Sequence, residues 1–275
     1  MLEPSLMNCR ICQGDTRLHF QARVLGKHDA DYRYCAACDH VFAADPFWLE
    51  EAYTDAIVKT DTDIAARNVF TSLRLAALLY FALDDRGQGT YVDVAGGYGL
   101  LTRLMRDMGF DYRWSDPYAE NLFARGFEAT ADDGPCSALS AIEVLEHTVN
   151  PLEFLQTNLR THGADTLVFT TETFSAGRPP SAREWSYYSL ETGQHIAFFS
   201  GEGLKKLGAR LGLTYHPLGR IHLLTSRPVS ALRLKLATNR ILALGLAFAA
   251  ARKLGSKRGA DQTRMVKLLR AQAEA

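Results

Sequence analysis

The chain has 275 residues, and its 31 Lys and Arg balance 31 Asp and Glu, giving a formal net charge of zero at pH 7. Hydrophobic residues make up 47% and charged residues 23%, a globular composition that excludes an intrinsically disordered or collagen-like chain. The length suits one large domain with an appendage, or two small domains. The zero balance also argues against a polycation that coats nucleic acid along its whole length.

Two features bear on the compartment. Residues 1–7 have no cationic flank leading into an apolar run, so we expect no secretory signal. The longest uncharged apolar run, residues 241–251, is shorter than the roughly 18 residues that a membrane-spanning helix needs. We therefore expect a protein of the reducing cytoplasm, with association at a membrane surface as an alternative.

Residues 1–46 show no helical period and carry four cysteines in two close pairs. Cys9 and Cys12 are followed, after 22 intervening residues, by Cys35 and Cys38, a pattern typical of structural zinc. In a reducing compartment such pairs bind metal more often than they form disulfides. Because four sulfur ligands leave no open position, we expect zinc to stabilise a small ribbon-like module and to take no part in catalysis.

Two alternatives stand beside this zinc site. The four thiols form two disulfides, which the compartment disfavours, or His40 replaces one sulfur, for which Cys38 is the better candidate. Cys136 is expected to be an ordinary small residue.

Residues 47–226 alternate predicted strands and helices. An apolar period of 3.6 residues predicts the first helix, and β-branched runs next to turn residues predict the strands. The expected strands are 91–95, 112–115, 138–144, 166–171, 213–216 and 221–225. The expected helices are 64–83, 100–108, 117–125, 151–159 and 201–211. This alternation predicts the α/β class with a doubly wound, mostly parallel sheet.

Residues 227–275 form a tail with a helical pattern. They carry eleven Lys and Arg against two acids, so residues 1–226 carry 20 basic residues against 29 acids. We favour helices that pack on the domain and expose their charges, because apolar helical faces usually meet protein. The alternative is a peripheral contact with a membrane or another anionic partner, since cations flank the apolar residues 241–251.

A glycine loop occupies residues 92–99, which read Val-Asp-Val-Ala-Gly-Gly-Tyr-Gly at a strand-to-helix turn. Glycines there let the backbone approach a ligand, although a plain tight turn or a dinucleotide site has the same pattern. Asp93 precedes the glycines, where a carboxylate can organise the loop or meet a cationic amino group. Asp116 ends the next strand, where an acid can accept both ribose hydroxyls. No Arg-rich phosphate site follows, so the expected ligand is a nucleoside without a pyrophosphate.

With these motifs, residues 64–226 resemble the class I S-adenosylmethionine-dependent methyltransferases. Residues 93–99 look like the first motif of that family, and Asp116 looks like its ribose acid. Residues 142–147 (Ile-Glu-Val-Leu-Glu-His) look like the segment that closes the fourth strand, and residues 194–200 are similar to a late segment of members that act on small molecules.

The resemblance implies a seven-stranded, Rossmann-like methyltransferase sheet and S-adenosylmethionine as cofactor. It implies cofactor contacts from Arg67, Asp93, Ala95, Gly96, Gly97, Gly99, Asp116, Ile142 and Glu143. Ala95 stands where the family has glycine, and Arg67 resembles an arginine that some members use to hold the cofactor carboxylate. The expected domains are a zinc module (1–46), a cofactor-binding domain (47–226) and a basic helical tail (227–275).

Glu143, Glu146 and His147 have helical spacing, which predicts one shared face at the carboxyl edge of the sheet. Relatives with this pattern hold a divalent cation together with a later histidine, which implies a site at Glu143, Glu146, His147 and His195. Such a cation polarises an acceptor hydroxyl. We favour a plainer interpretation, in which Glu143 shapes the cofactor pocket, Glu146 caps backbone and His147 packs.

His147 and His195 are the candidates for a general base, because imidazole titrates near a pKa of about 6.5. A structural role for each is the competing interpretation. Trp185, Tyr187 and Tyr188 precede His195 and either line an acceptor site or form the core of a lid.

The expected function is methyl transfer to a small-molecule acceptor, a sugar or sugar-nucleotide hydroxyl or carbon, because the cysteine quartet is similar to that of bacterial sugar-modifying members. The first alternative is RNA base methylation, which the lack of a basic excess in residues 1–45 disfavours. The second is a catalytically inactive, cofactor-binding scaffold.

Overall fold

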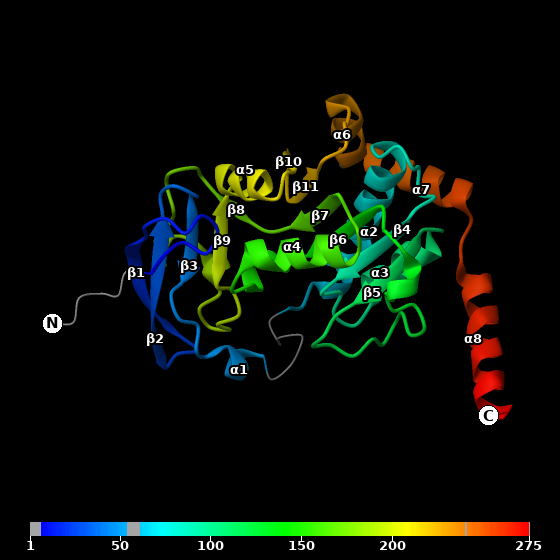
Figure 1. Ribbon diagram of the computed structural model, residues 1–275, viewed down its shortest axis with the longest axis horizontal. Helices are drawn as coiled ribbons and strands as arrows, with labels where there is room; N and C mark the ends of the chain where they lie inside the picture. The colour runs from blue at the N-terminus through cyan, green and yellow to red at the C-terminus, as the bar shows by residue number, and fades with distance from the viewer. Residues whose placement is uncertain (1–6, 54–60, 240, 275) are drawn as a thin grey trace. The chain divides into compact units, whose positions relative to one another are not determined.

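The computed structural model describes residues 7–53, 61–239 and 241–274. The chain divides into two compact units, each built from segments that are distant in sequence (Figure 1). Unit 1 comprises Met1–Val58, Ala141–Thr161 and Phe169–Ser226. Unit 2 comprises Lys59–Ser140, His162–Val168 and Arg227–Ala275.

Unit 1 contains a five-stranded sheet that the N-terminal residues share with a later part of the chain. In spatial order its strands are β1 (Arg17–Val24), β2 (His28–Cys35), β3 (His40–Ala43), β9 (Ala197–Ser200) and β8 (Thr173–Phe174). The first four pair antiparallel, and β8 lies parallel to β9. The cysteine-bearing strands therefore continue directly into β9, through a register that places Val41 opposite Phe198.

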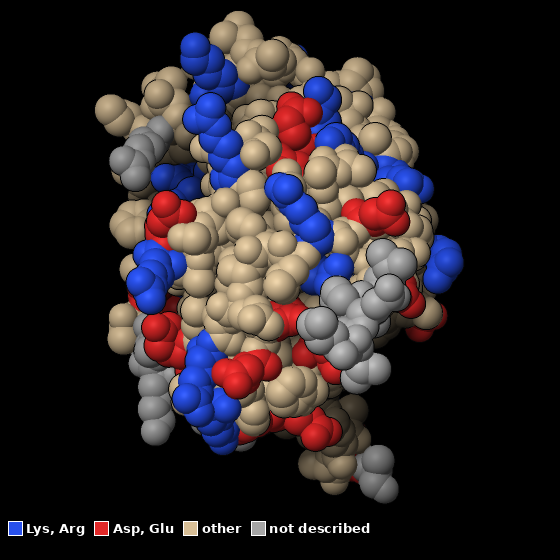
Figure 2. Space-filling view, turned by 90° about the vertical axis from the view of Figure 1, so that its left-hand side faces the viewer, with Lys and Arg blue, Asp and Glu red and all other residues tan. Residues whose placement is uncertain are grey.

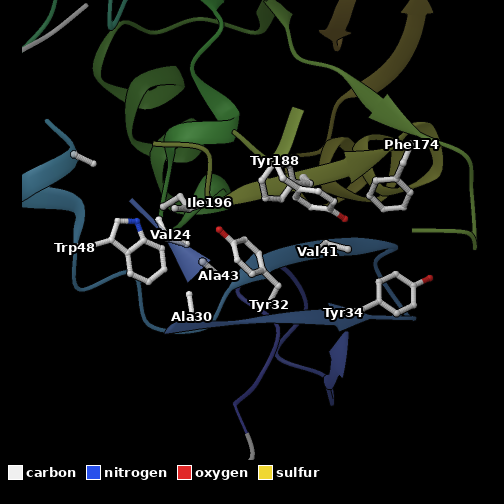
Figure 3. Packing of buried hydrophobic residues seen from close by; sticks show 12 residues of the cluster. Val24, Ala30, Tyr32, Tyr34, Val41, Ala43, Trp48, Phe174, Tyr188 and Ile196 are labelled. Atoms are coloured by element: carbon white, nitrogen blue, oxygen red, sulfur yellow. The ribbon is translucent and has the colours of Figure 1, made fainter. Parts of the chain in front are cut away.

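An aromatic core covers this sheet (Figure 3). Tyr32 from β2 is fully buried, stacks on Phe20 at a ring-centroid distance of 4.6 Å and meets Tyr188 edge-on at 5.9 Å. Trp48 donates from its indole N–H to the carbonyl of Gly193 at 2.8 Å, so its polar atom is satisfied inside the core. Tyr188 is thus a core aromatic residue.

The second sheet has the strand order β10-β11-β7-β6-β4-β5. Its strands are β4 (Thr90–Val94), β5 (Asp111–Ser115), β6 (Ala138–Ile142), β7 (Thr166–Thr170), β10 (Thr214–Leu218) and β11 (Ile221–Thr225). β4 is parallel to β5 and to β6, whereas β10 and β11 form the antiparallel pair expected from the sequence. Six described strands form this sheet instead of the expected seven; the short strand that follows β7, β8, pairs with β9 in the other sheet.

The helices and short 3₁₀ turns connect these strands. They are α1 (Leu49–Ala52), α2 (Ile64–Phe81), α3 (Leu100–Asp107), η1 (Ala131–Asp133), η2 (Leu145–His147), α4 (Pro151–Thr161), η3 (Ser186–Tyr188), α5 (Gly201–Arg210), α6 (Ala231–Thr238), α7 (Leu242–Leu254) and α8 (Arg258–Glu274). α4 begins with Pro151, which suits a first helical turn, and Ser200 caps α5 by accepting from the Gly203 N–H at 3.0 Å.

The expected helix 117–125 is wrong. Residues after β5 form bends and turns because side chains compete for the backbone donors. The Asp116 carboxylate accepts from the N–H groups of Tyr118 and Ala119, and the Asn121 side chain accepts from that of Ala124. The expected strand 138–144 also ends early, at Ile142, because Glu143 takes a left-handed φ of 54°.

The basic tail forms three helices, and α6 and α7 contact α2. Among the described residues, no single helix is long and apolar enough to span a membrane; α6 and α7 reach that level only as a pair bent by 95°. α8, red in Figure 1, is largely exposed except at Asp261.

Asp261 holds α8 in place through two arginines of α3. Its carboxylate accepts two hydrogen bonds from Arg106, at 2.7 and 2.8 Å, and one from Arg103 at 2.8 Å. Burial works against the charged carboxylate, but these guanidinium groups hold the pKa of Asp261 below its ordinary value. The Arg106 side chain is only 5% exposed and lies 3.8 Å from the ring centroid of Phe127.

Removal of this carboxylate leaves a buried guanidinium with one fewer counter-charge. We expect Asp261→Ala to lower the free energy of unfolding by about 3 kcal/mol, measured by urea denaturation. The matched control is Glu120→Ala, which breaks an ion pair to Arg125 that is mostly exposed and should change stability by less than about 1 kcal/mol. Equal stability of the two variants would show that the buried pairs do not anchor α8.

Candidate functional site

The loop between β4 and α3 is held from the end of the neighbouring strand β5. The Gly96 N–H donates to the Ser115 carbonyl at 3.3 Å, and the Gly97 N–H donates to Asp116 Oδ2 at 2.9 Å. In return, the Trp114 indole N–H donates to the Gly97 carbonyl at 2.8 Å. The glycine motif and the acid that follows the second strand are therefore parts of one hydrogen-bonded loop.

Three residues of this loop have left-handed backbone conformations: Ala95 (φ 52°), Gly97 (φ 52°) and Gly99 (φ 82°). A Cβ on Gly99 would lie 2.6 Å from the Asn121 side-chain oxygen, so this position requires glycine for space as well as for φ. Ala95, where the family has glycine, adopts the same region with a side chain, at a cost of about 1 kcal/mol.

Asp93 lies at the base of the loop and is 2% exposed. It accepts a 2.6 Å hydrogen bond from the Ser140 hydroxyl on the neighbouring strand β6. Burial, assisted by the nearby Asp116 carboxylate, raises the pKa of Asp93 to about 7, and the Ser140 hydrogen bond opposes this shift. Such a carboxylate is poised to become charged when a cation approaches.

Asp116 and Arg67, both expected to contact the cofactor, form hydrogen bonds within the protein. Asp116 Oδ1 accepts from the N–H of Tyr118 at 2.8 Å, and its Oδ2 accepts from Gly97, so the carboxylate is fixed in one orientation. Arg67 binds Asp61 through both guanidinium nitrogens, at 2.6 and 2.8 Å, and Asp63 at 2.9 Å. Its expected role with the cofactor carboxylate thus requires exchange of these acidic partners.

β6 ends at Ile142, and Glu143 follows it with a left-handed backbone. The Glu143 N–H donates to the Thr170 hydroxyl at 2.9 Å, which fixes the chain at this turn. A non-glycine residue in this backbone region stores strain.

The sequence segment that follows brings three groups of unit 1 together. Glu146, His147 and His195 each offer a ligand atom, and these atoms all lie within 4.8 Å of one another. Glu143, which was expected to join them, is not a member of this group. The two imidazole ring centroids are 4.8 Å apart.

Backbone carbonyls fix both imidazoles. His147 Nδ1 lies 3.0 Å from the Gln194 carbonyl oxygen, and His195 Nδ1 lies 2.6 Å from that of Tyr187. Because a carbonyl oxygen only accepts, both rings carry a proton on Nδ1, which assigns the lone pair of each neutral ring to Nε2. Burial lowers the pKa of His195 below its ordinary value.

Glu146 is fully buried, and its two carboxyl oxygens differ in their hydrogen bonding. Its Oε1 accepts a 2.6 Å hydrogen bond from the Tyr187 hydroxyl, whereas Oε2 has no hydrogen-bond partner among the described residues. Burial, with a smaller contribution from the Glu143 charge, raises the pKa of Glu146 to about 8. A buried oxygen without a donor beside two imidazole lone pairs suits a cation.

The four paired cysteines also converge. The sulfurs of Cys9, Cys12, Cys35 and Cys38 lie within 4.8 Å of one another, and the sulfurs of Cys12 and Cys35 are 3.6 Å apart. Backbone N–H groups two or three residues away point at three of these sulfurs, at 3.3–3.4 Å. His40 is not part of this group. It is fully buried, its ring stacks on those of Phe42 and Phe199, and it interacts with the Cys9 thiol.

Sequence reasoning missed several supporting residues. Ser140 and Trp114 hold the glycine loop, and Tyr187 orients Glu146. Tyr187 was considered only as a wall or lid residue. Ser140 carried one usable signal, since a polar residue inside an otherwise apolar strand needs a partner.

The chain matches the family described as Methyltransferase domain over residues 65–218, more than half of its length. It is 25% identical over 213 residues to the Ubiquinone biosynthesis O-methyltransferase of Caulobacter vibrioides, a match covering 65% of this chain and 77% of that protein. The chain therefore belongs to the Methyltransferase domain family. The expected enzyme class, an S-adenosylmethionine-dependent methyltransferase, is confirmed.

Two methyltransferases illustrate the solved structures to which the chain is similar. One is an O-methyltransferase family 2 protein from Planctomyces limnophilus in complex with apigenin, at 18% identity and TM-score 0.43 over 65% of each chain. The other is human N-acetylserotonin methyltransferase in complex with SAM, at 13% identity and TM-score 0.39 over 60% of this chain and 52% of that chain. This chain spans less than two thirds of the length of either structure.

We expect cofactor affinity to depend on pH through Asp93. Its pKa of about 7 means that the cationic cofactor must displace a proton below pH 7 but not above it. Calorimetry should therefore show S-adenosylmethionine binding about tenfold more weakly at pH 6 than at pH 8.

In Asp93→Asn, binding should be weaker at both pH values and the pH dependence should disappear. Asp107→Asn, a change at the last residue of α3, which is 34% exposed and pairs with Arg103, should bind as the unmodified chain does. Affinity that stays constant from pH 6 to pH 8 in the unmodified chain would contradict a role for the Asp93 charge.

Proposed function

We propose that this chain transfers the methyl group of S-adenosylmethionine to a hydroxyl oxygen of a small-molecule acceptor. Its family supports methyl transfer, and the O-methyltransferase name of its Caulobacter relative favours oxygen as the acceptor atom. The excess of acids in residues 1–226 disfavours a polyanionic acceptor such as RNA. In the view of Figure 2, basic and acidic side chains are interspersed over the visible face.

The observation that carries the proposal is the group formed by Glu146, His147 and His195. Two imidazoles whose Nδ1 atoms lie against backbone carbonyls and one carboxyl group with an unpartnered Oε2 among the described residues have ligand atoms within 4.8 Å of one another. The sulfonium methyl is already activated, so the protein needs chiefly to place the acceptor oxygen about 3–3.5 Å from it and to deal with the hydroxyl proton. This group supplies the acid–base chemistry for the second task.

The same three residues fit a divalent cation. Glu146 offers its unpartnered oxygen, and the carbonyls that hold His147 and His195 fix both rings in the tautomer that a metal ligand requires. When bound, such a cation lowers the pKa of a hydroxyl that it contacts. Tyr187, through its bond to Glu146, orients the carboxylate and satisfies its other oxygen.

For the acceptor we retain a sugar or sugar-nucleotide hydroxyl, with a phenolic hydroxyl as the second class. Tyr187 packs on His195 at 4.6 Å and Tyr53 on His147 at 6.1 Å, so aromatic surfaces flank the imidazoles. Flat faces of this kind suit a sugar ring or an aromatic ring. A labelled-methyl assay over hexoses, nucleotide sugars and catechols separates the two classes, and absence of transfer to every hydroxyl would contradict O-methylation.

We further propose structural zinc at the cysteine quartet. In a tetrahedral site with bonds of about 2.3 Å, sulfurs lie about 3.8 Å apart, close to the 3.6 Å between Cys12 and Cys35. The N–H groups aimed at the sulfurs stabilise thiolates. Zinc there would tie the turn before β1 to the turn between β2 and β3.

We expect His195→Ala and His147→Ala each to lower turnover by about 100-fold or more, because each removes a nitrogen that acts on the acceptor side. S-adenosylmethionine affinity, measured by calorimetry, should stay within about twofold. His216→Ala, on β10, is the matched control and should retain activity. Equal loss of cofactor binding in both variants would instead assign the two histidines structural roles.

Glu146→Gln tests the cation separately. Titration calorimetry with MgCl₂ or MnCl₂ should detect binding to the chelator-treated chain and little binding to the variant. If the treated chain binds neither metal and retains full activity, the cation assignment is wrong and the histidines act as bases.

Zinc should be found at one ion per chain by mass spectrometry of the protein purified without chelator. Cys12→Ser and Cys38→Ser should lose it and melt at a lower temperature, because metal binding contributes folding free energy. Cys136→Ser, which changes a buried thiol outside the quartet, should keep the zinc. A folded, zinc-free chain with unchanged stability would overturn this assignment.

A further inference from the structure

Helix α7 buries its small side chains and exposes its large ones. Ala243, Ala247 and Ala250 are at most 2% exposed on the helix that packs on α2. Leu244 and Phe248 are 46% and 64% exposed. An amphipathic helix of a soluble domain normally turns its Leu and Phe side chains inward. The packing on α2 therefore leaves the larger apolar face of α7 uncovered.

The neighbouring residues extend this apolar surface. Leu232 and Leu236 on α6 are 66% and 42% exposed, and Ile241, just before α7, is 83% exposed. Scattered exposed apolar residues are ordinary, but several such residues gathered on two helices that contact each other are typical of an interaction site. We call the group formed by residues 232, 236, 241, 242, 244 and 248 the apolar face.

A cavity opens beside this face within unit 2. Its volume is about 540 Å³, and it is lined mainly by apolar side chains of α2, α6 and α7, among them Tyr80, Leu236 and Leu246. Two lining residues, Arg86 and Arg233, are charged. The cavity thus combines a hydrocarbon-like interior with guanidinium groups.

The chain segment that carries the apolar face is exclusively basic in sequence. Residues 227–260 contain eight Lys and Arg and no acid. Two acids from outside this segment pair with it: Asp165 lies 2.7 Å from Arg227, and Asp84 lies 3.5 Å from Arg233 in an exposed ion pair. Arg252 and Lys253 end α7, where they also complement the helix dipole.

This charge pattern selects the kind of partner. A symmetric second copy would bring the same basic residues against each other, which is unfavourable. A surface that offers hydrocarbon beneath negative charge matches both the apolar face and its basic surroundings. α7 has 13 residues and α6 is bent from it by 95°, which suits helices lying in an interface.

We propose that α6 and α7 dock this protein on an anionic lipid bilayer. The apolar face enters the headgroup region, the cavity accepts a hydrocarbon chain, and the surrounding Lys and Arg bind anionic headgroups. Docking is independent of the methyl-transfer chemistry, so each assignment can fail without the other.

Flotation of the full chain with vesicles tests the proposal. We expect the protein to float with vesicles of phosphatidylcholine containing 30% phosphatidylglycerol, and at least fivefold less with phosphatidylcholine alone. Addition of 0.5 M NaCl should reduce the bound fraction, because salt screens the headgroup contacts. Failure to float with the anionic vesicles would overturn the proposal.

Paired variants separate the apolar and charged contributions. Leu244→Ser/Phe248→Ser should reduce the bound fraction at least fivefold, whereas Leu18→Ser/Phe47→Ser, which changes side chains of matched 48% and 61% exposure, should not. Arg252→Gln/Lys253→Gln should also bind less than Lys205→Gln/Lys206→Gln. Circular dichroism confirms the fold of each variant.

Sedimentation velocity tests the competing occupant. We expect a state of association that Leu244→Ser/Phe248→Ser does not change. A dimer that this variant dissociates, combined with no flotation of the unmodified chain, would assign the apolar face to a second copy.

Discussion

Two backbone hydrogen bonds of Ile196 connect strand β3 to the turn that carries Glu146 and His147. Its N–H donates to the Glu146 carbonyl at 2.7 Å, and its carbonyl accepts from the Ala43 N–H at 2.9 Å. One extended residue thus connects the end of β3 with the turn that carries Glu146 and His147, next to His195. Since Ile196 is fully buried, water does not compete for these bonds. Backbone hydrogen bonds therefore connect the N-terminal strands to the segment that carries Glu146 and His147.

Through this connection the cysteine quartet is linked to residues beyond its own strands. The quartet closes the turns around β1, β2 and β3, and β3 pairs with β9, which follows His195 directly. Order in the N-terminal residues is thereby transmitted through hydrogen-bonded backbone to the imidazoles. The glycine loop of unit 2 is held separately, by hydrogen bonds. Asp116 and Trp114 bind the backbone of Gly97, and Ser140 binds the Asp93 carboxylate.

Local patterns in the sequence predicted much of the fold. The apolar period of residues 64–83 and the β-branched run 166–171 correspond to α2 and β7, because burial and backbone preference agree there. The helix expected at 117–125 failed because Asp116 and Asn121 bind nearby backbone donors, a competition that apolar spacing does not reveal. The β3–β9 pair escaped prediction because its strands lie more than 150 residues apart in sequence.

The sequence by itself determined the glycine loop with its two acids and the cysteine quartet, because each is a short motif whose spacing carries its chemistry. The enzyme class followed from the resemblance of these motifs to a known family. Only the tertiary structure decided which groups meet. It placed Glu146, His147 and His195 together without Glu143. It also buried three alanines of α7 and left Leu244 and Phe248 exposed. Packing of α7 on α2, and not hydrophobicity alone, decides which face of the helix is buried.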